Sequence, residues 1–282
     1  MQLVHEPGLG SDYQVPLHVY GQADVSNSAL VILPALGLGA KFYRPLAEAL
    51  VDCFGLVVVM EQRGHGDSSI RPSRRCDYGF ADWLTADIPA AVAYASRNSG
   101  GKAPVIMGHS LGGHLAAMFV ALNPQAVSGL ILSACGSPWR KAFSGMNRLM
   151  VDFLRWVVIP VSAILGHYPG DKVGFGGREA RRLMADWRRL ASTNAYAAHG
   201  IEQNMDAELA NYTGPALVLR YADDPFAPKE AVAAVTKKLK SARLTEHCLT
   251  REQLGAPADH NQWARHPMAL TTLIKAWLGK VG

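Results

Sequence analysis

One serine of the chain stands in a setting that suits nucleophilic catalysis. Ser110 lies between Gly108 and Gly112 in the pentapeptide Gly-His-Ser-Leu-Gly. The apolar run before it is typical of a buried strand, and the stretch LGGHLAAMFVALN is typical of a helix. A serine on such a turn needs small neighbours, because the backbone crosses itself closely there. An ordinary helix cap would explain the serine but not the glycines. The pattern therefore predicts Ser110 as a nucleophile.

A serine hydroxyl needs a base, and the base needs an acid that orients it. Asp223 and Asp224 follow the apolar run ALVLRY, and hence the carboxyl end of a predicted strand, where open α/β sheets build their sites. Asp224 directly precedes Pro225 and is expected to point from the loop toward the base, whereas Asp223 is expected to cap the turn. We predict Asp224 as the acid and keep Asp223 as the alternative.

Three late histidines are candidates for the base. His260 lies in a loop containing Gly, Pro and Asp, between the last predicted strand and the last predicted helix. His247 falls within that strand. His266 precedes Pro267 at the start of the helix, where a capping or surface role suffices. His260 is therefore the predicted base, in the chain order Ser, Asp, His.

Short apolar runs alternate with longer amphipathic segments, which is the pattern of βα units around a mainly parallel sheet. The predicted buried strands are Ala29 to Leu33, Leu56 to Met60, Val105 to Gly108, Gly129 to Ser133, Ala216 to Tyr221 and Arg243 to Leu249. The predicted helices are Tyr43 to Val51, Ala81 to Ser96, Leu111 to Asn123, Lys229 to Leu239 and Pro267 to Leu278. An antiparallel edge strand is expected at Gln14 to Tyr20.

The segment 138–213 interrupts this alternation, because it contains no convincing buried strand. It predicts a mostly helical insertion into a core domain formed by residues 1–137 and 214–282.

The motifs together resemble the α/β-hydrolase superfamily over nearly the whole chain. The resemblance is carried by Gly108 to Gly112, by Arg63 to Ser68 (Arg-Gly-His-Gly-Asp-Ser), by Asp224 and by His260. Within the superfamily, the chain is similar to a group with a Tyr-Pro-Gly and an Asp-Trp-Arg segment in the cap, here 168–170 and 186–188. This closer similarity implies no substrate.

The resemblance implies the α/β-hydrolase fold, with a mainly parallel central sheet flanked by helices and with 138–213 as the helical cap over the nucleophile. Trp139, Trp156 and Trp187 are then expected to line an apolar substrate cleft. The alternative is that these tryptophans form the small core of the cap itself.

The resemblance also implies an oxyanion hole made by the backbone N–H groups of Leu111, after the nucleophile, and Leu36, in the loop after an early strand. The chain departs from the superfamily in that loop, where Pro34 and Ala35 replace the usual His-Gly.

These features predict a serine esterase that acts on a small or medium-sized carboxylic ester through an acyl-enzyme. The alternatives are a thioesterase or acyltransferase with the same triad, or a hydrolase-like binding protein that turns over little. Nothing in the sequence demands a cofactor or a metal ion. The fold and the triad do not specify the substrate.

Composition limits the partners that the sequence predicts. The chain has 282 residues and a net charge of +5, with its basic residues scattered among acids and without a nucleic-acid-binding motif. The four cysteines form no CxxC pair and are expected to be reduced and mostly buried. The amino terminus does not resemble a secretory signal, and the apolar stretches are too short to span a bilayer. A cytoplasmic protein without stable membrane insertion is expected, and a homodimer is left open.

Overall fold

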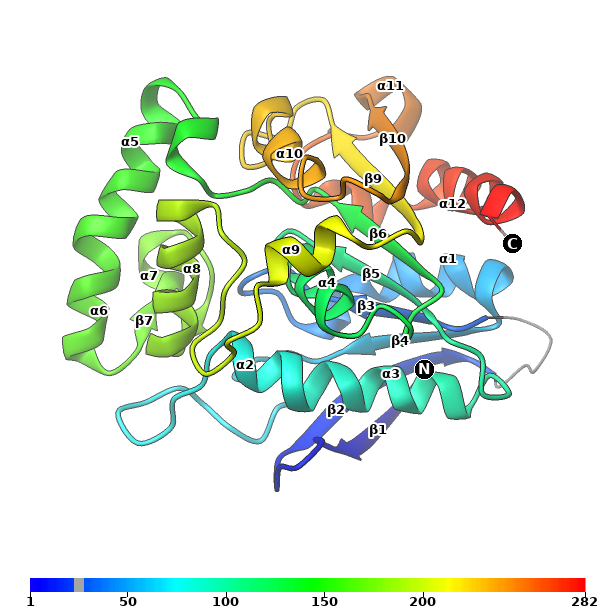
Figure 1. Ribbon diagram of the computed structural model, residues 1–282, viewed down its shortest axis with the longest axis horizontal. Helices are drawn as coiled ribbons and strands as arrows, with labels where there is room; N and C mark the ends of the chain where they lie inside the picture. Colours follow the sequence, from blue (N-terminus) through cyan, green and yellow to red (C-terminus); the bar gives the residue numbers. More distant parts are fainter. Residues whose placement is uncertain (23–27, 282) are drawn as a thin grey trace.

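The computed structural model describes residues 1–22 and 28–281 and is built around an eight-stranded sheet (Figure 1). The strand order is β1-β2-β4-β3-β5-β6-β9-β10. The strands from β4 to β10 in this order are parallel, whereas β2 pairs antiparallel with β4 and β1 pairs antiparallel with β2. The bounds are Gln2–Pro7 (β1), Gln14–Gly21 (β2), Leu30–Leu33 (β3), Leu56–Met60 (β4), Val105–His109 (β5), Gly129–Ser133 (β6), Pro215–Tyr221 (β9) and Arg243–Leu249 (β10).

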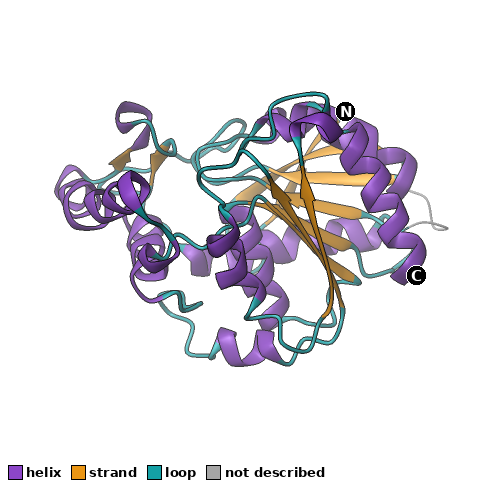
Figure 2. Cartoon of the chain, turned by 90° about the horizontal axis from the view of Figure 1, so that it is seen from above, coloured by secondary structure: helices purple, strands orange, loops and turns teal. Residues whose placement is uncertain are grey.

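Helices cover both faces of this sheet (Figure 2). Successive side chains of a strand point to opposite faces, so Val31 and Leu33 join one core while Leu30 and Ile32 join the other. The first core contains α3 (Ile88–Arg97), α4 (Leu111–Leu122) and α10 (Lys229–Thr236). The second contains α1 (Arg44–Phe54) and α12 (Met268–Val281). Because both faces are buried, the inner strands read as apolar runs rather than as alternating patterns.

Two strand predictions were wrong in their position within the sheet. Gln14 to Tyr20 is antiparallel but does not form the edge, because β1 pairs along its outer side from Gln2 with Val19 to Pro7 with Gln14. β1 lacks a run of large apolar residues, which is why the sequence did not reveal it. At the opposite edge, β10 is largely exposed rather than buried, since only β9 pairs with it.

Local turns modify the predicted helices. The segment predicted as one helix from Ala81 contains a π turn, η2 (Trp83–Asp87), between α2 (Phe80–Asp82) and α3. A short 3-10 helix, η1 (Ala40–Tyr43), precedes α1. The remaining elements outside 138–213 are α11 (Arg251–Leu254) and η5 (Gln262–Arg265).

Segment 138–213 is mostly helical, and its first two thirds extend from the sheet as a separate layer of helices (Figure 1). Its elements are η3 (Arg140–Ala142), α5 (Gly145–Phe153), η4 (Leu154–Val158), α6 (Ile159–Leu165), β7 (Tyr168–Pro169), α7 (Gly170–Val173), β8 (Arg178–Glu179), α8 (Arg181–Thr193) and α9 (Met205–Ala210). β7 and β8 form a small antiparallel pair. From residue 194 onward the chain returns to the sheet, and α9 packs on α4.

The strand order creates the place where a site can form. The chain passes from β3 to β4 on one side and then returns to β5 on the other side of β3. The loops that follow β3 and β5 therefore diverge at the carboxyl ends, which leaves a crevice between them. Leu36 follows β3 and Ser110 follows β5, so both lie at this crevice.

Two further features concern the hydropathy of the helices and the state of the cysteines. No helix in the described part of the chain has the length and apolar character needed to cross a membrane. All four cysteines are free, but only Cys135 is fully buried, and Cys248 is exposed. The expectation of mostly buried thiols was therefore wrong, and for Cys248 the reason is its place on the exposed edge strand β10.

Candidate active site

Ser110 sits at a strained turn between β5 and α4. Its φ of 52° and ψ of −115° are unusual for a residue with a side chain and cost about 1–3 kcal/mol. A Cβ on Gly108 would lie 2.2 Å from the carbonyl oxygen of Gly112, and one on Gly112 would lie 2.2 Å from that of Leu33. The glycines are therefore required by close backbone contacts, and the turn presents Ser110 at the crevice.

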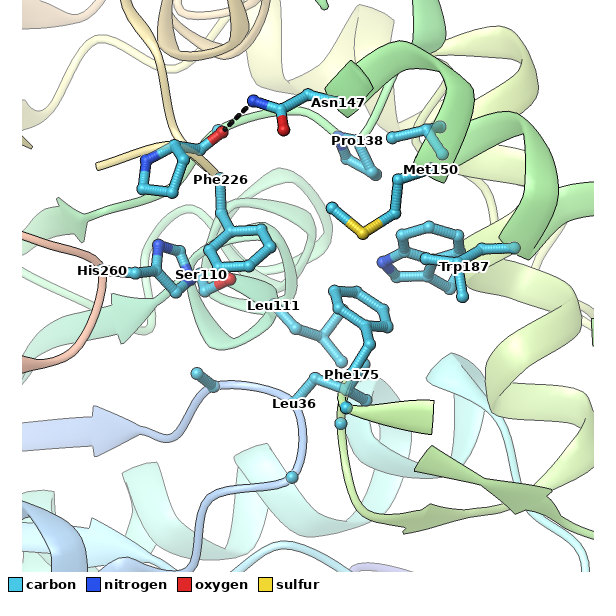
Figure 3. A pocket seen from close by; sticks show the side chains of 18 of the residues that line it. Leu36, Ser110, Leu111, Pro138, Asn147, Met150, Phe175, Trp187, Phe226 and His260 are labelled. Carbon is cyan, nitrogen blue, oxygen red and sulfur yellow. Dashed lines mark hydrogen bonds between the residues drawn. The ribbon is translucent and has the colours of Figure 1, made fainter. Parts of the chain in front are cut away.

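Asp224 and His260 lie together beside Ser110. Asp224 Oδ2 is 2.8 Å from His260 Nδ1, and the carboxylate is fully buried. Its other oxygen, Oδ1, accepts hydrogen bonds from the backbone N–H groups of Phe226 and Ala227, at 2.9 and 3.1 Å. These bonds fix the carboxylate so that one oxygen faces the imidazole. His260 and Ser110 line the same pocket side by side (Figure 3).

The competing acid and bases lie elsewhere. Asp223 is half exposed and pairs with Arg251 at 3.4 Å. His247 lies on edge strand β10, and His266 is an exposed residue before α12. Neither histidine lines the pocket that contains Ser110.

An aromatic cluster supports the loop that carries His260. Trp263 donates from Nε1 to the carbonyl oxygen of His260 at 2.8 Å and stacks on Tyr221, with ring centroids 5.2 Å apart. The His109 ring packs against both Trp263 and His260. Burial lowers the pKa of His109 well below its usual value, and the charge of His260 lowers it further. His109 therefore stays neutral and acts as packing beneath the base.

The loop after β3 is held in place by hydrogen bonds of Tyr43. The hydroxyl of Tyr43 accepts a hydrogen bond from Ala35 N at 2.8 Å and contacts His109 Nδ1 at the same distance. This bridge connects the loop to the strand that carries the nucleophile. Leu36, the next residue, and Leu111 both line the pocket beside Ser110. The two residues whose N–H groups were predicted to form an oxyanion hole therefore both belong to this pocket.

The pocket encloses about 250 Å³ and is mainly apolar. Its walls come from the sheet loops and from segment 138–213, so that the latter lies over Ser110 (Figure 3). The side chains labelled in that view include Leu36, Leu111, Pro138, Asn147, Met150, Phe175, Trp187 and Phe226. An apolar cavity of this size suits the acyl chain of a small or medium-sized ester.

The three predicted cap tryptophans have different surroundings. Trp187 is buried and lines the pocket, in edge-to-face contact with Phe175. Trp156 is 63% exposed, and neither it nor Trp139 is among the pocket residues. Trp156 belongs to a helix face that points away from the pocket, which the position of a tryptophan in the sequence does not reveal.

Several pocket residues were missed by the sequence analysis. Phe226 follows the acid by two positions, and its ring packs against His260 at 5.3 Å between centroids. Its closeness to Asp224 in the sequence could have indicated that Phe226 lies in the pocket. No sequence pattern marks Met150 and Phe175 as pocket residues, because their place in the pocket depends on how 138–213 folds over the sheet. His114 also lines the pocket; it contacts Tyr196 Oη at 2.9 Å, and burial lowers its pKa to about 4.

One group of side chains in the described part of the chain is close enough to hold a metal ion. It consists of His18, Glu61 and Asp67 and lies outside the pocket. Glu61 already accepts hydrogen bonds from Ala40 N and Asp67 N, while Lys41 pairs with Asp67 at 3.3 Å. These bonds explain the group as a brace between loops, with no ion required.

Comparisons with known proteins agree with this architecture. A family model described as serine aminopeptidase, S33, matches residues 25–251. A curated relative named "Putative carbamate hydrolase RutD", from Variovorax paradoxus (strain S110), is 24% identical over 262 residues, covering 82% of this chain and 86% of the relative.

Two solved structures share the fold over nearly their full lengths. One is a monoacylglycerol lipase of Paleococcus ferrophilus, with TM-score 0.63, 16% identity and all of both chains covered. The other is a thioesterase domain from the curacin biosynthetic pathway, with TM-score 0.61, 16% identity, and 98% of this chain and 100% of that chain covered. The family match spans most of the sequence, and the chain belongs to the serine aminopeptidase S33 family of α/β-hydrolases and is a hydrolase.

Proposed function

We propose that the chain hydrolyses carboxylic esters of small or medium-sized molecules through Ser110, His260 and Asp224. The observation that carries the proposal is the buried Asp224 carboxylate, which is fixed by two backbone N–H groups and lies 2.8 Å from His260 Nδ1. The pair lies beside a serine on a strained turn at the base of an apolar pocket. Few structural roles require this combination, whereas acyl transfer does.

In this mechanism, His260 Nε2 removes the proton from Ser110 Oγ as that oxygen attacks the ester carbonyl. Asp224 keeps the proton of the imidazole on Nδ1, so that Nε2 is free to accept. The backbone N–H groups of Leu36 and Leu111 would stabilise the oxyanion, and loss of one such donor typically slows turnover about 100- to 1000-fold. The alcohol leaves with the proton from His260, and water then hydrolyses the acyl-enzyme by the same route.

Thioester hydrolysis and acyl transfer remain the second candidate, because they form the same acyl-enzyme. A solved structural neighbour is a thioesterase domain, and another is a monoacylglycerol lipase. The size and apolar character of the pocket favour a compact acyl group. They do not distinguish an ester from a thioester. A binding protein is disfavoured by the strained Ser110, since a receptor gains nothing from this turn.

The first experiment is labelling with a fluorophosphonate probe, with Ser110→Ala as the matched variant. Labelling of the wild type and its loss in the variant, with an unchanged melting temperature, would support the proposal. Labelling that persists on another serine would overturn it. Activity over p-nitrophenyl esters of increasing chain length, compared with acyl-CoA thioesters and a carbamate, then separates the two candidates.

We further propose that 138–213 acts as the cap that selects substrates, and that Trp187 is one of its residues that contact the substrate. The proposal includes a cytoplasmic location, a small ester or acyl compound as the partner, and no nucleic acid. A homodimer stays open, and light scattering of the purified protein decides it.

A further inference from the structure

The outer face of segment 138–213 carries an unusual concentration of exposed apolar side chains. Nine of the sixteen large apolar residues that are exposed in the described part of the chain fall within twenty consecutive positions. We call them the apolar stripe: Met146, Leu149, Met150, Phe153, Trp156, Val157, Val161, Ile164 and Leu165. Since single exposed apolar residues are normal but contiguous ones are rare, the stripe indicates an interaction surface.

The stripe is one face of a continuous helical column formed by α5, η4 and α6. Its members recur every three or four residues over the 21 positions of these elements, which gives a helix about 30 Å long. The opposite face is already buried, through residues such as Val151, Leu154 and Ile159, and α6 packs there on α8. The column lies at the outer edge of the molecule (Figure 1). The stripe therefore faces solvent because the inner face is already filled.

Charge indicates what covers the stripe. Residues 138–193 contain ten Lys and Arg residues against four Asp and Glu, a net charge of +6, whereas the whole chain carries +5. The part of the chain that carries the stripe is therefore net positive. A second copy packing symmetrically on this face would bring two such segments together, and like charges oppose that contact. A negatively charged lipid surface complements both the charge and the apolar side chains.

The surroundings of Trp156 fit the same occupant. Its ring is 63% exposed and lies under two guanidinium groups, with Arg155 Cζ at 5.4 Å and Arg188 Cζ at 5.1 Å from the ring centroid. Arg155 is buried and pairs with Asp152 at 2.8 Å, whereas Arg188 is partly exposed. Trp156 therefore offers an apolar ring to acyl chains and Arg188 a cation to headgroups, which is the arrangement found at membrane interfaces.

The stripe is continuous with the pocket. Met150 belongs to both, and Asn147, Val151 and Leu154 on the same column line the pocket wall. A surface docked on the stripe would therefore lie next to the route to Ser110.

We propose that the apolar stripe docks the protein onto a negatively charged lipid surface, with the helical column lying along it. The pocket then takes its ester from that layer, a second step that rests on the proposed esterase function. The docking itself requires no catalysis.

The test is cosedimentation with vesicles of phosphatidylcholine containing phosphatidylglycerol, compared with vesicles of phosphatidylcholine alone. The wild type should bind the charged vesicles more strongly, and added salt should weaken binding. A variant combining Leu149→Ser, Phe153→Ser and Ile164→Ser removes apolar surface without touching pocket residues, and its partitioning should fall at least about tenfold. A matched control, Leu9→Ser with Met268→Ser, changes side chains that are equally exposed but distant in sequence from the stripe, and should bind normally.

Further outcomes separate docking from catalysis. Ser110→Ala should bind vesicles like the wild type, so failure of the esterase proposal would leave docking intact. The stripe variant should retain its melting temperature and its turnover of a soluble acetate ester, but lose turnover of an ester carried in vesicles. Vesicle binding unchanged in the stripe variant, or absent from the wild type, would overturn the proposal. A wild-type dimer that the stripe variant dissociates, without vesicle binding, would assign the face to a second copy.

Discussion

The geometry around Asp224 predicts how a minimal change would disable the enzyme. In Asp224→Asn, the two backbone N–H groups that now bind Oδ1 would select the amide oxygen for that position. The amide NH₂ would then face His260 Nδ1 and donate to it. The imidazole would carry its proton on Nε2, where it cannot accept the proton of Ser110. The side chain keeps its shape, so the fold should persist while the base is held in the wrong tautomer.

The expected magnitude follows from this tautomer argument. The corresponding change in the serine-protease template lowers turnover about 10,000-fold. Since each tenfold loss corresponds to about 1.36 kcal/mol, the activation barrier should rise by about 5.5 kcal/mol. Asp223→Asn is the matched control, because Asp223 is 45% exposed and pairs only with an Arg251 side chain that is 70% exposed. Exposed pairs of this kind contribute about 0–1 kcal/mol to stability, and turnover should stay within about twofold of the wild type.

The assay is kcat/KM for p-nitrophenyl butyrate between pH 6 and 9, with thermal unfolding of each variant measured in parallel. Asp224→Asn should unfold close to the wild type, so that its loss of activity cannot be assigned to unfolding. Equal losses in the two variants, or a larger loss in Asp223→Asn, would refute the assignment of the acid.

Three other predictions test the elbow, the pocket and the contact between the loops. Gly112→Ala should lower the free energy of unfolding by about 3 kcal/mol or more in a denaturant titration, because its Cβ would lie 2.2 Å from a carbonyl oxygen. In the control, Gly279→Ala, the added Cβ meets no atom within 4 Å, so the effect should be neutral or stabilising. Similar stability of the two variants would contradict this. Met150→Trp should narrow the pocket and shift the preferred acyl chain of p-nitrophenyl esters toward shorter lengths, and an unchanged preference would remove Met150 from the acyl site. Burial lowers the pKa of His65, but the hydrogen bonds and charge of Glu179 raise it more, to a value above 6.5. The stability that this pair adds is therefore complete below pH 6.5 and is lost as pH rises through the folded-state pKa of His65. The difference in melting temperature between wild type and Glu179→Gln should then shrink with rising pH. A constant difference would refute the ion pair.

The His65–Glu179 pair also shows why the docking of segment 138–213 was not predictable. His65 was noted only as part of a family motif, and Glu179 carried no signal in the sequence. The two residues are 114 positions apart, yet His65 Nε2 lies 3.1 Å from the buried carboxylate. Glu179 in turn accepts from Gly177 N, in the loop that packs against Gly37. Such contacts depend on how segment 138–213 folds onto the sheet, and local patterns do not encode that docking.

The sequence by itself determined the features that arise from local constraints. The glycines around Ser110 were readable because only glycine fits where a Cβ would lie 2.2 Å from a backbone carbonyl oxygen. The inner strands were readable because burial on both faces demands uninterrupted apolar runs. Chain order then placed Asp224 and His260 in loops that meet at one end of the sheet, where the structure brings them within 2.8 Å.

Only the tertiary structure decided which side chains share a surface. It placed Trp187 in the pocket and Trp156 on the outside, although both occur in helical segments. It added β1 as the true edge of the sheet and turned an apolar helix face toward solvent. An amphipathic helix specifies an apolar face through its periodicity, but the partner of that face depends on contacts between distant segments. The pocket and the apolar stripe therefore share one helical column, with Met150 in both, and packing alone decided which of its residues face the pocket and which face solvent.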